Sequence, residues 1–148
     1  MAFVRHRYDY EERGGAKHAA ACLAVPDHAV VKTLVMRDEA GRALLVLMHG
    51  DRRVSAKRLA RALGVRRVAA CSPAEALRAT GYVVGGISPF GTRSPLPVYA
   101  EASILALERI FINGGRRGLL LEMAPDSLEA ALPLRPVSVA ADSSEHGA

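Results

Sequence analysis

Tryptophan is absent from the 148-residue chain, and cysteine occurs only twice, as Cys22 and Cys71. Two thiols are too few for the disulfide framework of a small secreted domain, so reduced thiols in a cytoplasm fit the sequence better. Charged residues begin at Arg5, and no run approaches the ~20 apolar residues that span a bilayer. The sequence therefore predicts a cytoplasmic protein with no membrane partner.

Apolar residues make up 50% of the chain and charged residues 24%, as is typical of a globular domain. A domain of this size buries about 68–70% of its unfolded surface, which supplies a core without disulfides or a structural metal. A second domain would have too little core. Only the residues after Pro136 have the small and polar composition of a frayed end. We expect one domain over residues 1–136 and a flexible tail over 137–148.

Strand and helix signals are intermixed along the chain. Runs rich in β-formers favour strands at 3–8, 29–36, 43–48, 110–112 and 118–123, with a hairpin turn at 38–41. Helices are expected over 16–25, from the Ser55 cap to Gly64, from the capping box Ser72-Pro73-Ala74-Glu75, near 101–108, and from Asp126. Because the strand connections vary between hairpin and crossover lengths, we expect an α+β fold whose mixed sheet, curved or closed into a barrel, is surrounded by helices.

One segment of the chain is strongly basic. The net charge is +5, but residues 52–67 carry +7 with no acidic residue, leaving −2 elsewhere. Clustered Lys and Arg gain affinity for nucleic acid by releasing counterions, and without an aromatic residue the contact would be to sugar and phosphate. A solvated helix face is an equally good interpretation. The basic residues of this segment are Arg52, Arg53, Lys57, Arg58, Arg61, Arg66 and Arg67.

Lys32 interrupts the apolar run AVVKTLVM. Strand alternation places it in a row with Val30 and Leu34 and places Thr33 on the other face. Both faces are expected to be buried, so the ammonium should lie at a cavity mouth, where it would meet a phosphate, a carboxylate or a developing oxyanion. The alternative is a lysine at a strand end that extends its ammonium to solvent.

Two glycine-rich segments are candidate ligand contacts. GYVVGGISPFGTRSPLP combines glycines, which allow close backbone approach, with prolines, which fix the following chain. FINGGRRG offers Asn113 as a hydrogen-bonding side chain and Arg116 and Arg117 as phosphate contacts. Ordinary turns and a surface hairpin are the alternatives. Neither segment matches a nucleotide-binding fingerprint.

Other reactive side chains lack a readable context. His18 and Cys22 are four residues apart on an expected helix, but no third ligand has recognisable spacing, so no metal site is predicted. Cys71 and the serines have no recognisable base nearby in the sequence, so no Ser or Cys nucleophile is supported.

Taken in order, VVKTLV, SAKRLARALG, TGYVVGGISPFG with LP shortly after, and INGGRRGLLLE resemble the YbaK/EbsC family, the free-standing relatives of the prolyl-tRNA synthetase editing domain. The resemblance extends over about residues 29–132 and implies a mixed β-barrel core with no cofactor. It also implies hydrolysis, in trans, of the ester that joins a wrong amino acid to a tRNA 3′ end. It makes Lys32 the catalytic residue and implies these substrate-binding positions: Tyr8, Gly85, Gly86, Ile87, Ser88 and Asn113.

With this family in view, the expected substrate is a tRNA, such as tRNA(Pro), mischarged with Cys, Ala, Ser or Thr. Lys32 would bind the phosphate of the terminal adenosine or stabilise the oxyanion, while backbone groups of the glycine-rich segment orient the ester for water or for the substrate's own thiol. The tRNA would contact Arg52, Arg53, Lys57, Arg58 and Arg61. Prolyl-tRNA synthetase is a second candidate partner, and the chain is expected to be a monomer or a homodimer.

Several positions depart from the family pattern. Asn113 replaces the usual serine, and Leu120 replaces a commonly polar or acidic residue. Glu101 stands where aspartate is common, and Tyr10 and His49 stand at common histidine and proline positions. These departures motivate an alternative, in which the chain binds tRNA or an aminoacyl ligand without turnover. A metal-dependent or redox protein that uses His18 and Cys22 is a third hypothesis.

Overall fold

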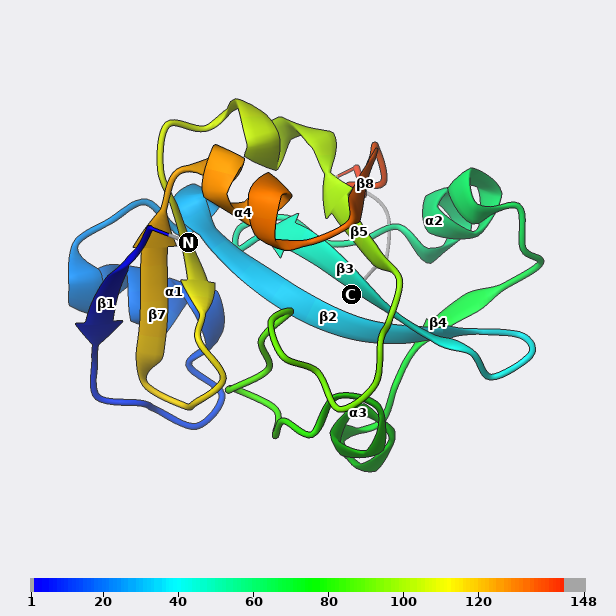
Figure 1. Cartoon of the computed structure of the whole chain (residues 1–148), viewed down its shortest axis with the longest axis horizontal. Helices are drawn as coiled ribbons and strands as arrows, with labels where there is room; N and C mark the ends of the chain where they lie inside the picture. Colours follow the sequence, from blue (N-terminus) through cyan, green and yellow to red (C-terminus); the bar gives the residue numbers. More distant parts are fainter. Residues whose placement is uncertain (1, 143–148) are drawn as a thin grey trace.

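The computed structural model describes residues 2–142 (Figure 1). Over these residues the elements in chain order are β1 (Val4–Arg7), α1 (Gly15–Leu23), the 3-10 helix η1 (Asp27–Ala29), β2 (Val30–Asp38), β3 (Ala43–His49), α2 (Ala56–Leu63), β4 (Val68–Ala70), α3 (Pro73–Thr80), β5 (Val98–Glu101), the 3-10 helix η2 (Ala102–Ala106), β6 (Ile110–Asn113), β7 (Leu119–Met123), α4 (Pro125–Ala131) and β8 (Leu134–Val137).

The strands form one mixed sheet in the order β1-β7-β6-β2-β3-β5-β8, with β4 paired to β2 off this path. The β2–β3 hairpin is antiparallel, whereas β2 with β6 and β3 with β5 are parallel. The expected α+β fold is confirmed. Of the two expected forms, the open curved sheet is the one present, because β1 and β8 lie at opposite ends of the strand order.

The β2–β3 hairpin crosses the centre of the molecule, and helices cover the sheet around it. Figure 1 shows α1 and β1 at one end, α2 at the other, and α3 and α4 on opposite sides. Alternate side chains of β2 enter different cores: Val31 and Val35 pack into one cluster and Met36 into the cluster beneath α2. This arrangement explains why the strand is apolar on both faces, since each buried aliphatic side chain contributes roughly 1.5–3 kcal/mol.

The capping residues expected for α2 and α3 are confirmed. Ser55 caps α2 by accepting a hydrogen bond from the backbone N–H of Arg58, and Gly64 ends it in the left-handed conformation. Ser72 and Glu75 form the expected capping box of α3, with mutual bonds of 3.1 and 2.8 Å.

Two of the later helices differ from expectation. The helix expected near 101–108 is the short 3-10 helix η2 (Ala102–Ala106). The last helix, α4, begins at Pro125, one residue before Asp126, and its N-cap residue Ala124 makes no side-chain cap.

The expected boundary of the flexible tail is wrong for its first residues. Pro136 lies inside β8, and the chain beyond it is buried at Val139 and Ala140. The Glu101 carboxylate accepts hydrogen bonds from the backbone N–H groups of both residues. Residues 137–142 therefore belong to the domain, because a buried carboxylate and the core under α2 hold them. Residues 143–148 of the expected tail lie outside the described residues.

None of the helices in residues 2–142 has the length and apolar character needed to cross a membrane.

Candidate active site

One edge of β2 has a gap between two neighbouring strands. β6 registers with β2 only at Val30 and Val31, and β4 registers only from Met36 to Asp38. Within the described part of the chain, no strand pairs with this edge in between. A cavity of about 430 Å³ is lined by every residue from Val30 to Val35. The gap therefore exposes a short stretch of main chain and both rows of its side chains to a single cavity.

Five of the seven sequence-predicted catalytic and substrate-binding residues line this cavity: Tyr8, Lys32, Gly85, Ile87 and Asn113. They come from the segment before α1, from β2, from the loop between α3 and β5, and from the end of β6. The fold thus gathers positions that are up to 105 residues apart in the printed sequence.

The other two predicted positions, Gly86 and Ser88, are buried beside the cavity rather than in its lining. A Cβ at Gly86 would lie 2.9 Å from the backbone nitrogen of Arg117, so this glycine lets two loops touch backbone to backbone. The Ser88 hydroxyl accepts a hydrogen bond from the backbone N–H of Phe90 at 3.1 Å. Both residues shape the loop from behind.

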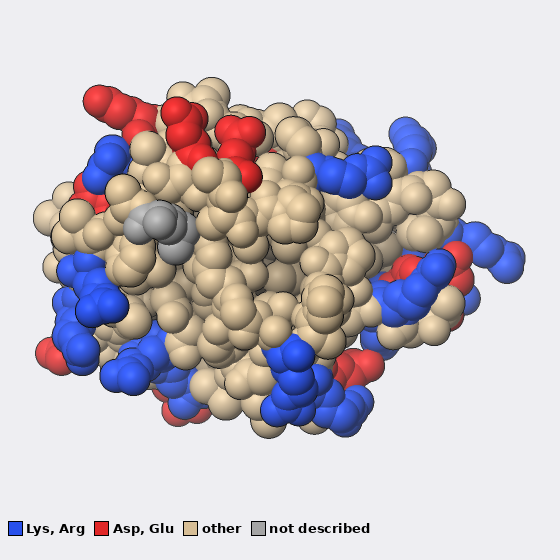
Figure 2. Space-filling view, viewed as in Figure 1, with Lys and Arg blue, Asp and Glu red and all other residues tan. Residues whose placement is uncertain are grey.

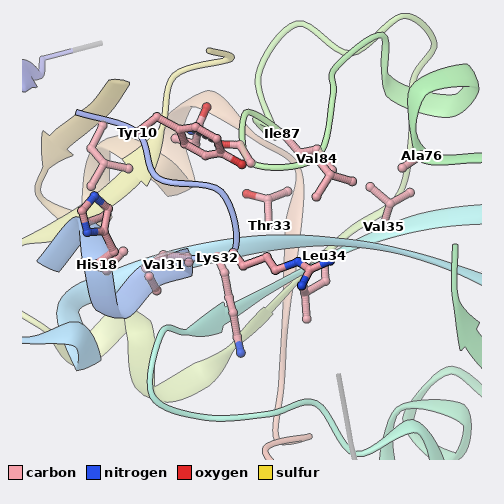
Figure 3. A pocket seen from close by; sticks show the side chains of 18 of the residues that line it. Tyr10, His18, Val31, Lys32, Thr33, Leu34, Val35, Ala76, Val84 and Ile87 are labelled. Carbon is pink, nitrogen blue, oxygen red and sulfur yellow. Dashed lines mark hydrogen bonds between the residues drawn. The ribbon is translucent and has the colours of Figure 1, made fainter. Parts of the chain in front are cut away.

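Lys32 is half-buried in the cavity wall, but its ammonium does not face the glycine-rich loop. Figure 3 shows its side chain extending to the opposite side of β2 from Thr33 and Ile87. Burial lowers the pKa of the Lys32 ammonium, the nearby Arg53 lowers it further, and Asp51 opposes both effects. Because the positive charges of Lys32 and Arg53 repel each other, an anion bound between them would be stabilised.

Asn113 holds the two glycine-rich segments together. Its side-chain oxygen accepts hydrogen bonds from the backbone N–H groups of Gly115 and Arg116, at 2.6 and 3.1 Å. Its amide nitrogen donates to the carbonyl oxygens of Gly85 and Arg116, at 3.2 and 3.1 Å. Because these bonds use both donors of the amide, Asn113 positions the wall of the cavity.

Gly85 is pressed against Tyr10. Its φ is +91°, and a Cβ there would lie 2.5 Å from the Tyr10 hydroxyl oxygen, so glycine is required twice over. Arg117 closes the arrangement, since its guanidinium lies 5.0 Å from the centre of the Tyr10 ring and its Nε donates to the carbonyl oxygen of Val84 at 3.0 Å. The glycine-rich loop, the Tyr10 ring and the Arg117 guanidinium therefore contact one another at the cavity wall.

Tyr8 belongs to the same wall and is half-buried. Its backbone N–H donates to the carbonyl oxygen of Gly118 at 3.0 Å, and its ring meets His18 edge-on, with 6.0 Å between the ring centres. Burial is the largest of the effects that raise the pKa of its phenol. Tyr8 therefore presents a neutral hydroxyl at neutral pH.

Nothing in the sequence alone gives Thr33 a functional role. Its hydroxyl oxygen is buried in the cavity wall and has no hydrogen-bond partner among residues 2–142. Figure 3 shows Thr33 on the same side of β2 as Tyr10 and Ile87. An unsatisfied buried hydroxyl costs about 1–3 kcal/mol, so a bound ligand that hydrogen-bonds to it would recover this energy. Strand alternation placed Thr33 opposite Lys32, but only the pairing of β4 and β6 reveals the gap.

Two side-chain clusters have ligand-type residues but do not fit a metal ion. Cys22 Sγ lies 3.5 Å from His18 Nε2, a nitrogen that donates to the carbonyl oxygen of Asp9. His28, His49 and Asp51 place three ligand-type atoms within 4.8 Å of one another, but the two imidazole rings are stacked, with 3.8 Å between their centres and 6° between their planes. A metal about 2.0–2.1 Å from each nitrogen must lie near both ring planes, which stacked rings do not allow.

Both nitrogens of His49 are also occupied. Nδ1 donates to the carbonyl oxygen of His28 at 2.8 Å, because a carbonyl can only accept, so Nε2 is left to accept a bond of 2.7 Å from the Ser103 hydroxyl. Burial is the main cause that lowers the pKa of His49. His49 is therefore a hydrogen-bonded part of the interior with a neutral imidazole, whereas His28 and Asp51 lie nearer the surface.

Cys71 lines the cavity, and burial raises the pKa of its thiol. A thiol of raised pKa carries little of the thiolate form that acts as a nucleophile.

The basic segment lies at the α2 end of the molecule and does not line the cavity. Figure 2 shows Lys and Arg side chains at this end, with acidic side chains among them. Arg52 donates to the carbonyl oxygen of Ala141, and Arg58 donates to that of Ala140 and pairs with Asp142 at 2.6 Å. These two arginines hold the end of the described chain, whereas Lys57 and Arg61 are exposed on α2.

The fold is an α+β domain with an open mixed sheet and a cavity beside the gap in the strand pairing of β2. The chain belongs to the aminoacyl-tRNA editing domain family, whose profile matches residues 11–131. This finding confirms the family resemblance of the glycine-rich and lysine-containing motifs.

Individual relatives agree with this assignment. A protein of Enterococcus faecalis named as a proposed Cys-tRNA(Pro)/Cys-tRNA(Cys) deacylase, EbsC, is 27% identical over 118 residues, which cover 80% of this chain and 72% of the relative. The proline–tRNA ligase of Desulfotalea psychrophila is 29% identical over 114 residues, 76% of this chain and 20% of the ligase. A solved structure described as a proposed trans-editing enzyme for prolyl tRNA synthetase matches with a TM-score of 0.85 at 26% identity, over 95% of this chain and 87% of that one.

Proposed function

We propose that this protein is a trans-acting deacylase that hydrolyses the ester of a tRNA mischarged with a small amino acid, namely Cys, Ala, Ser or Thr. The observation that carries the proposal is the single cavity that unites Lys32, Gly85 and Ile87 at the gap in β2. The relatives named for deacylation and trans-editing support the same reaction class. A tRNA in the cytoplasm is the proposed substrate, and prolyl-tRNA synthetase is a candidate partner because a proline–tRNA ligase contains a similar segment.

Different parts of the substrate bind on the two sides of β2. Lys32, with Arg53 close by, binds a phosphate of the tRNA 3′ end on one side of the strand. The aminoacyl ester passes the gap and reaches the other side, where Thr33 offers a hydroxyl and Ile87 an apolar surface. Side chains larger than the space between β2 and the glycine-rich loop are excluded by overlap, whereas a single group on a small amino acid changes binding by only about 1–3 kcal/mol.

The hydrolysis requires little from the protein beyond placement. The oxygen of water attacks the ester carbonyl carbon, the bond from that carbon to the ribose oxygen breaks, and the ribose oxygen takes up the proton that the water loses. With a cysteinyl substrate, its own thiol can attack instead and pass its proton to the ribose oxygen, and water then hydrolyses the cyclic thioester that is released. Because an aminoacyl ester is already activated, a fixed geometry and polar groups near the developing oxyanion supply the acceleration. Loop amides, held by the bonds of Asn113, would act here as the polar groups.

The basic segment provides a second contact for the tRNA. Arg53, Lys57 and Arg61 are exposed and would bind the sugar-phosphate backbone. Arg52 and Arg58 contribute positive charge from the same surface while they anchor residues 140–142.

Deacylation of a panel of Ala-, Ser-, Thr- and Cys-charged tRNAs tests the proposal. We expect release of at least one amino acid by the wild type, loss of this activity in Lys32→Ala and partial recovery in Lys32→Arg, which keeps the charge. Lys17→Ala is the matched control, since Lys17 is exposed on α1 and does not line the cavity. Wild-type turnover by Lys32→Ala would remove Lys32 from the mechanism.

A binding module without turnover is the second candidate. It is favoured by the commitment of the Asn113 amide to backbone groups and by the position of Lys32 across β2 from the glycine-rich loop. A purified protein that binds tRNA and hydrolyses no member of the panel would select this candidate.

A further inference from the structure

We propose that Tyr10, backed by Arg117, is the platform on which the terminal adenine of the tRNA stacks. This inference rests on the proposed function, since it names the part of the same cavity that takes the base. Tyr10 was noted in the sequence only as a departure from the family pattern, at a position where histidine is common.

The geometry around Tyr10 fixes its ring in place. The Arg117 guanidinium lies 5.0 Å from the ring centre, and Arg117 is itself tied to the carbonyl oxygen of Val84 by a bond of 3.0 Å. Gly85 packs against the hydroxyl end of the ring, so closely that a Cβ would lie 2.5 Å from the oxygen. A ring held by a cation and a loop presents its surface to a ligand with little loss of side-chain entropy.

The ring also belongs to the cavity. Tyr10 lines it, and Figure 3 shows the side chain on the same side of β2 as Thr33 and Ile87. Single-stranded RNA ends are recognised by stacking of unpaired bases on aromatic rings and on Arg guanidinium planes. Tyr8 is the other tyrosine in the lining, but its ring is engaged edge-on by His18. Tyr10 is therefore the aromatic surface that the cavity offers to a purine.

This placement complements the rest of the proposed substrate. With the phosphate at Lys32 and Arg53 on one side of β2, the adenosine reaches across the gap to Tyr10, and the ester on its ribose lies beside Thr33. The strand edge thus separates the charged part of the nucleotide from its base.

The test uses 2-aminopurine riboside 5′-monophosphate, which has no neighbouring base to quench its fluorescence. Because the chain contains no tryptophan, excitation above 300 nm reads the probe alone even at high protein concentration. We expect quenching on titration with the wild type and with Tyr10→Phe. Tyr10→Leu should lose the quenching and bind the probe roughly 5- to 150-fold more weakly, the loss of one base–aromatic stack.

Tyr99→Leu is the matched control, because Tyr99 has its own Arg partner, Arg135 at 5.6 Å, and does not line the cavity. It should quench like the wild type. Absence of binding or quenching by the wild type, or undiminished quenching by a folded Tyr10→Leu, overturns the inference. Deacylation by the wild type, measured in parallel on the charged tRNA panel, separates this failure from failure of the proposed function itself.

Discussion

Lys32 and Thr33 are consecutive in β2, yet their side chains enter the same cavity from opposite sides of the strand. Strand geometry sends neighbouring side chains to opposite faces, and in most sheets they would meet different environments. Here, among the residues that the structure describes, no strand pairs with one edge of β2 between the segments paired with β6 and with β4, so the space on one side of β2 is continuous with the space on the other. A cation and an unsatisfied hydroxyl are thereby placed on either side of one piece of main chain.

Removing the Thr33 hydroxyl should reduce activity more than stability. Thr33→Val keeps the shape of the side chain and removes an oxygen that has no partner within residues 2–142, so the free energy of unfolding should be unchanged or slightly higher. If the substrate bonds to this oxygen, kcat/KM for deacylation should fall by about tenfold, which corresponds to one hydrogen bond of about 1.4 kcal/mol. Thr33→Ser should retain most of the activity. Equal kcat/KM for wild type and Thr33→Val would exclude the contact.

Asn113 should be required for both stability and activity. Asn113→Ala removes two acceptor and two donor contacts to the backbone, and we expect a loss of about 1–3 kcal/mol in the free energy of unfolding, measured by urea denaturation. Deacylation should fall in parallel because the carbonyl of Gly85 is no longer held. Asn113→Asp keeps the acceptors for Gly115 and Arg116, so its stability and its activity should lie between those of the wild type and of Asn113→Ala. Full stability of Asn113→Ala would contradict the role given to these bonds.

The contact between α2 and tRNA should appear in the salt dependence of binding. Neutralising the exposed pair Lys57 and Arg61 to Gln should weaken tRNA binding and lower the slope of log K against log salt by about one unit for each phosphate that the variant no longer neutralises. Amino-acid preference should not change. The same two substitutions at Arg5 and Arg7 of β1, at the other end of the sheet, are the control. An unchanged slope in the α2 variant would return this segment to an ordinary solvated helix face.

Features with a local signal in the sequence could be predicted. The hairpin turn, the caps at Ser55 and Ser72 and the alternation around Lys32 depend on neighbours within a few residues, and each has the expected form. Five of the seven catalytic and substrate-binding positions that the family resemblance implied also line the cavity, because most of them lie in motifs that are compact in the sequence.

What the sequence could not supply depends on long-range pairing. Nothing local to Lys32 indicates that the pairing of β2 with β6 ends at Val31 and that its pairing with β4 begins at Met36. Neither the gap nor the place of Thr33 in the cavity wall could therefore be derived. The packing of residues 137–142 was missed for the same reason, since its cause is a carboxylate at Glu101. The bond from the Asn113 amide to the Gly85 carbonyl oxygen could not be derived either, because the two residues are 28 positions apart in the sequence.

His49 should make the fold sensitive to acid. In the native state its pKa is lowered by burial from an ordinary value of 6.5, so its neutral form is the one that the fold stabilises. Above 6.5 both native and unfolded states hold the ring neutral, and this stabilisation is fully present. As the pH falls below 6.5 the unfolded state binds a proton before the native state does, and stability falls until the native ring also titrates.

His49→Gln tests this dependence, because glutamine can donate to the carbonyl of His28 and accept from Ser103 but does not titrate. The variant should be less stable than the wild type at pH 8, because it cannot stack on the His28 ring. Between pH 6.5 and 5, however, its free energy of unfolding, measured by urea denaturation, should decline less steeply than that of the wild type. Equal slopes in this range would show that His49 titrates alike in the folded and unfolded chains, and that other groups cause any acid sensitivity.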